Sequence, residues 1–157
     1  MATEIEYKYL IDLNAWKKIK PNKSIEINQA YLLTNPEKTI RVRTKGSKGY
    51  FTIKGNSFGA SRAEFEYEIP VDEAKELISK FCDNSIQKIR HEIKVGNHIW
   101  EVDEFLGNND GLFVAEIELT SENENFELPN WVTENVTLNQ KYANSNLSLN
   151  PFCNWEK

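Results

Sequence analysis

Charged and apolar residues alternate along most of this chain, and this alternation limits the folds that the chain can adopt. In Glu4-Ile5-Glu6-Tyr7-Lys8 every second residue is charged, and the residues between them are apolar. A period of two is typical of β-strands, whose successive side chains point to opposite faces. With residues 25–33 added, the pattern predicts eight strands, over residues 4–10, 25–33, 39–45, 50–55, 62–69, 87–95, 98–105 and 112–120. Eight such strands with little helix favour a mainly β (α+β) fold, an antiparallel sheet closed into an eight-stranded β-barrel.

Apolar residues at helical spacing are few. Ala74, Leu77, Ile78 and Phe81 predict a helix over residues 72–81, whose acidic first turn suits the helix dipole. Shorter helices are expected over residues 14–19, 129–135 and 140–147. The chain shows no internal repeat and no linker-like change of composition, and 157 residues are too few for two ordinary domains. Residues 1–157 are therefore expected to form one domain with a few peripheral helices.

The charge balance and the apolar runs argue against several classes of protein. There are 24 acidic residues against 19 basic ones, which disfavours a nucleic-acid binder that relies on bulk positive charge. No apolar run approaches the ~18 residues that a membrane span needs, and residues 1–4 do not begin a secretory signal. We therefore expect a cytoplasmic protein with no membrane or nucleic-acid partner, in which Cys82 and Cys153 are reduced.

The charged face of the predicted strands is segregated by sign. Glu116 and Glu118 lie two residues apart on one face, and so do Arg41 and Arg43. A face that serves only solubility should mix signs, because like neighbours repel each other. A ligand-binding face explains the segregation, since carboxylates bind hard divalent cations, and Lys and Arg bind phosphate oxygens. A solvated charged face is the alternative. The face comprises Glu4, Glu6, Lys8, Arg41, Arg43, Lys54, Arg62, Glu64, Glu66, Glu68, Lys88, Arg90, Glu101, Asp103, Glu116 and Glu118.

Other chemistries lack the residues that they need. His91, His98 and the two cysteines match no usual zinc-site spacing. The stretch from Gly46 to Gly49 lacks the spacing of a phosphate-binding P-loop and joins two predicted strands. No G-x-S-x-G or Cys/His arrangement suggests an acyl-transfer nucleophile. A carboxylate metal site beside a basic phosphate clamp is what remains.

Seven motifs occur in order along nearly the whole chain, and together they resemble the CYTH domain family, the triphosphate tunnel metalloenzymes. The first is the ExExK motif at residues 4–8, and residues 141–147 are similar to the closing segment of the family. The other motifs are IRVR at 40–43, TIKG at 52–55, RAEFEYEIP at 62–70, KIR at 88–90, WEVD at 100–103 and AEIEL at 115–119.

The resemblance implies an eight-stranded tunnel barrel that acts on linear triphosphates with Mg²⁺ or Mn²⁺. It implies a phosphate clamp of Lys8, Arg41, Arg43, Lys54, Lys88 and Arg90. It implies metal binding by Glu4, Glu6, Glu64, Glu66, Asp103, Glu116 and Glu118. Glu4, Glu6, Lys8, Glu116 and Glu118 would carry the catalysis. Arg62 and Glu68 are expected near strand ends, and the match leaves open whether the C-terminal segment with Lys141 and Tyr142 acts as a lid.

Four functions fit these residues. Hydrolysis of inorganic tripolyphosphate comes first, with ATP and other nucleotides as poorer substrates, because the short chain leaves nothing for a separate nucleoside-binding module. The others are a class IV-type adenylate cyclase that makes cyclic AMP and pyrophosphate, a thiamine triphosphatase, and a module that only binds polyphosphate or nucleotides. A protein that only binds has little use for seven carboxylates. The sequence leaves open whether the protein is a monomer or a homodimer.

Overall fold

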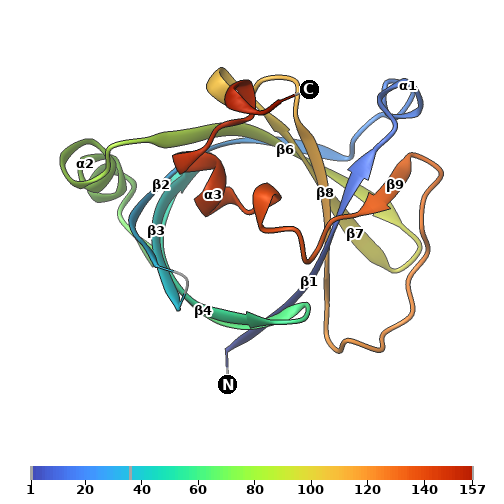
Figure 1. Cartoon of the computed structure of the whole chain (residues 1–157), viewed down its shortest axis with the longest axis horizontal. Coiled ribbons are helices and arrows are strands. Elements are labelled where there is room, and N and C mark those ends of the chain that lie inside the picture. Colours follow the sequence, from blue (N-terminus) through green and yellow to red (C-terminus); the bar gives the residue numbers. More distant parts are fainter. Residues whose placement is uncertain (1, 36, 157) are drawn as a thin grey trace.

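Nine antiparallel strands form one sheet in the computed structural model, which describes residues 2–35 and 37–156. The strands of this described part are β1 (Thr3–Ile11), β2 (Lys23–Asn35), β3 (Lys38–Lys45), β4 (Lys48–Phe58), β5 (Ser61–Ile69), β6 (Ser85–Val95), β7 (His98–Phe105), β8 (Phe113–Leu119) and β9 (Val132–Asn135). The order around the sheet is β5-β4-β3-β2-β6-β7-β8-β1, and β1 pairs with β5 to close the ring (Figure 1). The eight predicted strands and the closed barrel are confirmed.

Two-residue turns join several hairpins of the described chain, and two examples begin with a left-handed glycine. Gly46 and Ser47 connect β3 to β4, and Gly96 and Asn97 connect β6 to β7. Gly46 has φ +59° and Gly96 has φ +61°, a left-handed conformation that glycine adopts without steric cost. These turns fix the register of each hairpin and therefore decide which residues face the inside of the ring.

The helices differ from the sequence prediction mainly toward the C-terminus. α2 (Val71–Phe81) is the expected helix, and α1 (Leu13–Trp16) is shorter than predicted. The helix predicted over residues 129–135 is wrong: the segment forms a turn and then β9, which adds to the far end of β1 at Tyr9 and Ile11. The β-branched pair Val132 and Thr133 favours this extended backbone, and the indole of the preceding tryptophan is buried in the core.

The predicted helix over residues 140–147 is instead two short pieces. A 3₁₀ turn (Gln140–Tyr142) and α3 (Asn144–Leu149) are separated by Ala143, whose backbone is extended at ψ 136°. Further 3₁₀ turns lie at Gly107–Asn109 and Phe152–Asn154. Cys82 and Cys153 are free thiols, as expected. Among the described residues no helix has the length and apolar character to span a membrane.

The main hydrophobic core lies on the outer wall of the barrel. It covers β1, β6, β7 and β8, where the apolar residues of each alternating strand point away from the tunnel. Residues from α1 and from the segment after β8 complete it. Its buried members are Tyr9, Trp16, Ile93, Trp100, Val102, Ala115, Ile117, Leu119 and Trp131. Because the apolar rows pack outward, the charged rows are left facing inward.

A second, smaller core lies inside the barrel, where the C-terminal segment crosses the ring (Figure 1). Leu147 of α3 is 1 % exposed and packs with Ile86, Phe105, Leu112 and Val114. These strand residues continue the inward rows: Ile86 precedes Lys88 on β6, and Val114 precedes Glu116 on β8. The inward face therefore changes from charged to apolar where α3 seals it.

Candidate active site

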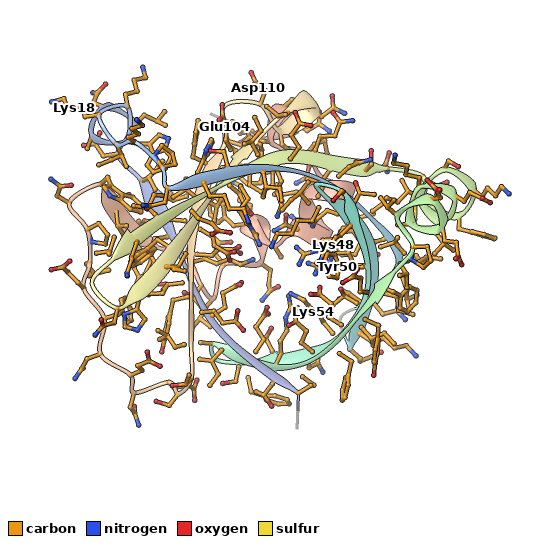
Figure 2. The ribbon with its side chains drawn as sticks, turned by 180° about the vertical axis from the view of Figure 1, so that it is seen from behind. Lys18, Lys48, Tyr50, Lys54, Glu104 and Asp110 are labelled. Carbon is orange, nitrogen blue, oxygen red and sulfur yellow. The ribbon has the colours of Figure 1, made fainter. Side chains whose placement is uncertain are left out.

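All eight barrel strands contribute side chains to a charged cavity inside the ring. The cavity has a volume of about 220 Å³ and is lined by almost every predicted site residue, Asp103 being the exception among those described. Lys54 lies within the ring in Figure 2, whereas Lys18, in the turn after α1, and Asp110 lie outside it. Arg62 also lines the cavity, while Glu68 pairs at 3.6 Å with Lys48 on the exposed rim.

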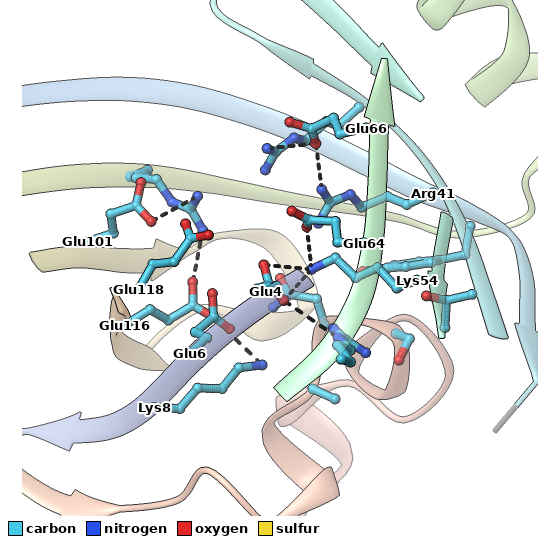
Figure 3. Close-up of a pocket in the computed structure, with 18 of the residues that line it drawn as sticks. Glu4, Glu6, Lys8, Arg41, Lys54, Glu64, Glu66, Glu101, Glu116 and Glu118 are labelled. Atoms are coloured by element: carbon cyan, nitrogen blue, oxygen red, sulfur yellow. Dashed lines mark hydrogen bonds and ion pairs between the residues drawn. The ribbon is translucent and has the colours of Figure 1, made fainter. Parts of the chain in front are cut away.

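In four pairs, an inward-facing charge stands opposite a charge of the other sign on the neighbouring strand. Lys54 on β4 faces Glu64 on β5, and their Nζ and Oε2 atoms are 3.2 Å apart (Figure 3). The same nitrogen donates to Glu4, which also pairs with Arg62. Burial would raise the pKa of Glu4, but Lys54 and Arg62 outweigh it and lower that pKa to about 2. Other facing pairs are Lys8 with Glu116 at 3.7 Å and Arg90 with Asp103 at 2.8 Å.

Glu101 faces Glu116 across β7 and β8, although each also pairs with Arg90. Glu6 and Glu118 depart further from this pattern, because here one carboxylate faces another across β1 and β8. Neither side chain forms an ion pair or a hydrogen bond within the described part of the chain. Burial, together with the charges of Glu116 and Glu4, raises the pKa of Glu6 well above its ordinary value (Figure 3). Burial and three carboxylates also raise the pKa of Glu118. Such facing like charges destabilise a sheet, and a bound cation would relieve them.

Asp103 is the hub of the buried ion pairs rather than a lining residue. It is 1 % exposed and accepts bonds from Lys88 Nζ at 2.7 Å and from Arg90 Nε and Nη2 at 2.8 and 2.9 Å. Burial alone would raise the pKa of Asp103, but the two cations hold it well below its usual range. For Lys88, burial outweighs the carboxylate and lowers the pKa to about 8. Asp103 thereby fixes both cations in place.

Arg41 and Arg43 share one carboxylate. Their Nη2 atoms donate to the same oxygen of Glu66 at 3.1 and 3.2 Å, and Thr52 donates to it at 2.8 Å. Burial and the neighbouring guanidinium groups of Arg41 and Arg90 lower the pKa of Arg43 to about 10. The Nε atoms of Arg41 and Arg43 are buried without a partner among the described residues. The protein therefore leaves both guanidinium groups under-satisfied, as expected for a site that binds an anion.

Several residues of the cavity were not among the predicted site residues. Glu101 was placed on the predicted charged face but in none of the predicted site sets, whereas Lys45 continues the charged alternation of β3, so the period of two could have assigned it. The neutral residues Tyr31, Thr39 and Asn144 gave no such signal. Within residues 2–35 and 37–156, no three His, Cys, Asp or Glu side chains are grouped to hold a metal ion between them. Any metal here would need further ligands.

Comparison with known proteins identifies the family to which this barrel belongs. The CYTH domain matches residues 2–151. The chain belongs to the CYTH domain family. The family predicted from the seven motifs is thus confirmed, and the match spans the described barrel and its C-terminal segment up to Pro151.

Relatives of this CYTH chain include two curated proteins named inorganic triphosphatase. One, from Acetivibrio thermocellus, is 44 % identical over 158 residues and is covered completely, as is the present chain. The other, from Nitrosomonas europaea, is 30 % identical over 94 % of this chain and 97 % of its own length. A crystal structure of an inorganic triphosphatase is 28 % identical, with a TM-score of 0.64, and the match covers 95 % of this chain and 96 % of that one.

Proposed function

We propose that this CYTH protein hydrolyses inorganic tripolyphosphate to pyrophosphate and phosphate. The observation that carries the proposal is the cavity itself, where cations from five strands face inward around one shared space. A linear chain of phosphates carries several negative charges, and cations placed around it can hold it in one orientation. The two relatives named inorganic triphosphatase favour this reaction over a cyclase or a thiamine triphosphatase.

The lining of the cavity also supports an inorganic substrate. Charged and short polar side chains surround it, and Tyr31 is the one aromatic ring among the described lining residues. Sites for organic ligands are mostly apolar and aromatic, with few polar groups. We therefore propose that ATP and other nucleotides are poorer substrates, and that the protein acts in the cytoplasm.

The phosphate clamp would consist of the six predicted cations, held by the carboxylates between them. Asp103 positions Lys88 and Arg90, and Glu66 positions Arg41 and Arg43. Because Asp103 is 1 % exposed, Lys88 and Arg90 are held in place when the cavity is empty, while Glu66 holds Arg41 and Arg43 from a more exposed position. A preorganised clamp stabilises the charge of the transferred phosphoryl group without rearranging during the reaction.

The donor set of the cavity fits Mg²⁺ or Mn²⁺. Glu6 and Glu118 would hold the ion, because they face each other without a cation between them. Mg²⁺ is commonly bound by one or two carboxylates together with phosphate oxygens of the substrate, which fits a cavity without a complete protein cage. Glu4, Glu64, Glu66, Asp103 and Glu116 were also predicted as ligands, and each is ion-paired in the structure. A bound divalent ion would neutralise charge on the phosphoryl oxygens.

Incubation of the pure protein with tripolyphosphate, ATP or thiamine triphosphate tests the proposal. Each would be tried with Mg²⁺, Mn²⁺ or EDTA, with products separated by chromatography. We expect pyrophosphate and phosphate from tripolyphosphate, loss of activity in EDTA and recovery with added metal. Cyclic AMP from ATP would show a cyclase instead, and tight binding without turnover would show a binding module.

A pair of matched variants tests whether the reaction takes place in the charged cavity. Glu6→Gln should lower kcat/KM by more than about tenfold, because it removes a proposed metal ligand. Glu68→Gln is the control, since Glu68 shares the alternating pattern but lies exposed on the rim beside Lys48. Equal, small effects of both variants would favour a solvated charged face over an active site.

A further inference from the structure

We propose that Asn144, on the C-terminal segment, is a substrate-binding residue whose Nδ2 group donates to a phosphate oxygen. It lines the charged cavity but belongs to none of the barrel strands. This inference rests on the proposed function, because it names a further contact with the same triphosphate substrate.

The hydrogen bonds of Asn144 fix the orientation of its amide. Its Oδ1 atom accepts from Lys88 Nζ at 2.9 Å and from Gln29 Nε2 at 3.2 Å. An ammonium group only donates, so the atom that faces Lys88 must be the oxygen of the amide. The other end of the amide, Nδ2, has no hydrogen-bond partner in the described part of the chain. Two donors therefore hold the oxygen and leave two N–H groups for a ligand.

Gln29 is itself held firmly enough to orient its neighbour. It is completely buried on β2, and its Nε2 also donates to the hydroxyl of Tyr31 at 3.1 Å. A flipped Gln29 amide would place its oxygen against the oxygen of Asn144, which is unfavourable. Gln29 and Lys88 therefore both donate to the Oδ1 atom of Asn144, and neither bond can be reversed.

The backbone around Asn144 is anchored to the barrel on both sides. Leu147, one helical turn later, is buried in the inner apolar cluster. Tyr142, two residues earlier, packs against the same cluster and edge-on against Trp155, with ring centroids 5.3 Å apart. The ammonium of Lys141 lies 4.1 Å from the centre of the same Trp155 ring. These contacts hold the segment across the ring (Figure 1), so Asn144 is placed before any ligand arrives.

The chemistry of the position favours a phosphate oxygen as the acceptor. The Lys88 ammonium beside Asn144 is bound to Asp103 and to Asn144, which uses two of its three donors. An anion that reaches the free donor of Lys88 would also meet the free amide donors of Asn144. The two residues would then contact the same phosphate group as a joint pair, one charged and one neutral.

Two substitutions at Asn144 separate a substrate contact from a merely structural role. Asn144→Ala removes both the donor to phosphate and the acceptor for Lys88. Asn144→Asp keeps the acceptor for Lys88 but turns the free donor into a negatively charged oxygen. If Asn144 only held Lys88, the Asp variant should match or exceed the wild type. If Asn144 binds phosphate, the Asp variant should be worse than the Ala variant.

The measurements are KM and kcat for tripolyphosphate, and the dissociation constant of tripolyphosphate in EDTA by titration calorimetry. We expect about a tenfold rise in KM and in the dissociation constant for Asn144→Ala, and a larger rise for Asn144→Asp. Asn146→Ala and Asn146→Asp are the controls, because Asn146 lies on the same helix but does not line the charged cavity. They should leave both constants within about twofold. Thermal melts of all variants check that each is folded.

The outcomes of this experiment are distinct. An Asp variant that binds tripolyphosphate as tightly as the wild type would overturn the inference, and so would equal effects at Asn144 and Asn146. A wild type that does not hydrolyse tripolyphosphate would refute the proposed function alone, since the titration in EDTA still measures the contact of Asn144.

Discussion

Replacing Asp103 with Asn would remove the charge at the centre of the buried ion pairs while nearly keeping the side-chain volume. Three charge-assisted hydrogen bonds end on this carboxylate, at 2.7, 2.8 and 2.9 Å. The amide of Asn can still accept through one oxygen, but its NH₂ group would face cations that only donate. In this variant Arg90 would keep its ion pair with Glu116, which is 3.0 Å long. Lys88 would lose the one ion pair that it forms in the described structure.

The expected cost follows from the burial of these groups. Lys88 and Asp103 side chains are 2 % and 1 % exposed, so water cannot replace the missing partner. Removing one partner of such a buried pair costs about 3–5 kcal/mol. For a domain of this length that loss corresponds to a melting temperature roughly 6–20 °C lower.

Thermal and urea unfolding of the metal-free protein at pH 7 would measure this difference. Glu104→Gln is the matched control, because Glu104 follows Asp103 on β7 but faces outward and pairs with His91 with a side chain 36 % exposed. The control should cost less than about 1 kcal/mol. If Asp103→Asn costs no more than the control, Asp103 does not hold the clamp together.

The pH dependence gives a second check on Asp103. Its folded pKa lies below the ordinary unfolded value of about 3.9, so its contribution to stability is fully present above that value. The contribution is lost as the pH falls through the folded pKa. The difference between wild type and Asp103→Asn should therefore be constant from about pH 5 to 7 and shrink only below about pH 4. A difference that disappears near pH 6 would contradict this assignment.

Further predictions concern the other charges. Glu6→Gln should raise the melting temperature of the metal-free protein, because a buried carboxylate with a raised pKa is costly to ionise. Glu116→Gln should lower the melting temperature, since Glu116 pairs with Arg90 at 3.0 Å and with Lys8 at 3.7 Å. Differential scanning calorimetry of both variants would show whether the two melting temperatures change in opposite directions. Arg41→Ala should weaken tripolyphosphate binding by about 1.5–3 kcal/mol in titration calorimetry, and an unchanged affinity would remove Arg41 from the clamp. Mg²⁺ plus tripolyphosphate at a hundredfold excess over Kd should stabilise the wild type by about 2.7 kcal/mol, or roughly 5–10 °C, and no shift would argue against a confined site.

The period of two predicted most of the barrel, because each strand carries its own signal. In residues 62–69 and 98–105 the alternation itself decides which side chains share a face. The segment over residues 129–135 carried no such signal. Its strand exists because Trp131 enters the outer core beside Trp16 and Trp100, and that tertiary contact is invisible in the local sequence.

The sequence predicted which charged residues belong to the candidate site, because charged alternation is visible in the sequence. It could not predict which of them face each other, because that depends on the register between strands. Sequence alone placed Asp103 and Glu6 in one acidic set, yet Asp103 faces Arg90 and Glu6 faces Glu118. The pairing follows from the register of the hairpins and from the closure of the ring, which brings β1 beside β5 and β8. Asn144 had no pattern at all, since a neutral side chain outside the strands acquires its position from the burial of Leu147.

The placement of the main core on the outer wall separates most of the apolar packing from the charged cavity, although inward residues such as Asp103 also contribute to stability. Trp100 and Val102 stabilise the wall from outside, while Glu101 and Asp103 on the same strand face inward. Substitutions at outward positions of a strand are therefore limited by the packing of the outer core, and substitutions at inward positions by the charges of the cavity. Combinatorial libraries confined to inward positions could retune which anion the barrel accepts while leaving the outer packing intact. This division makes the barrel a suitable scaffold for engineering new anion receptors.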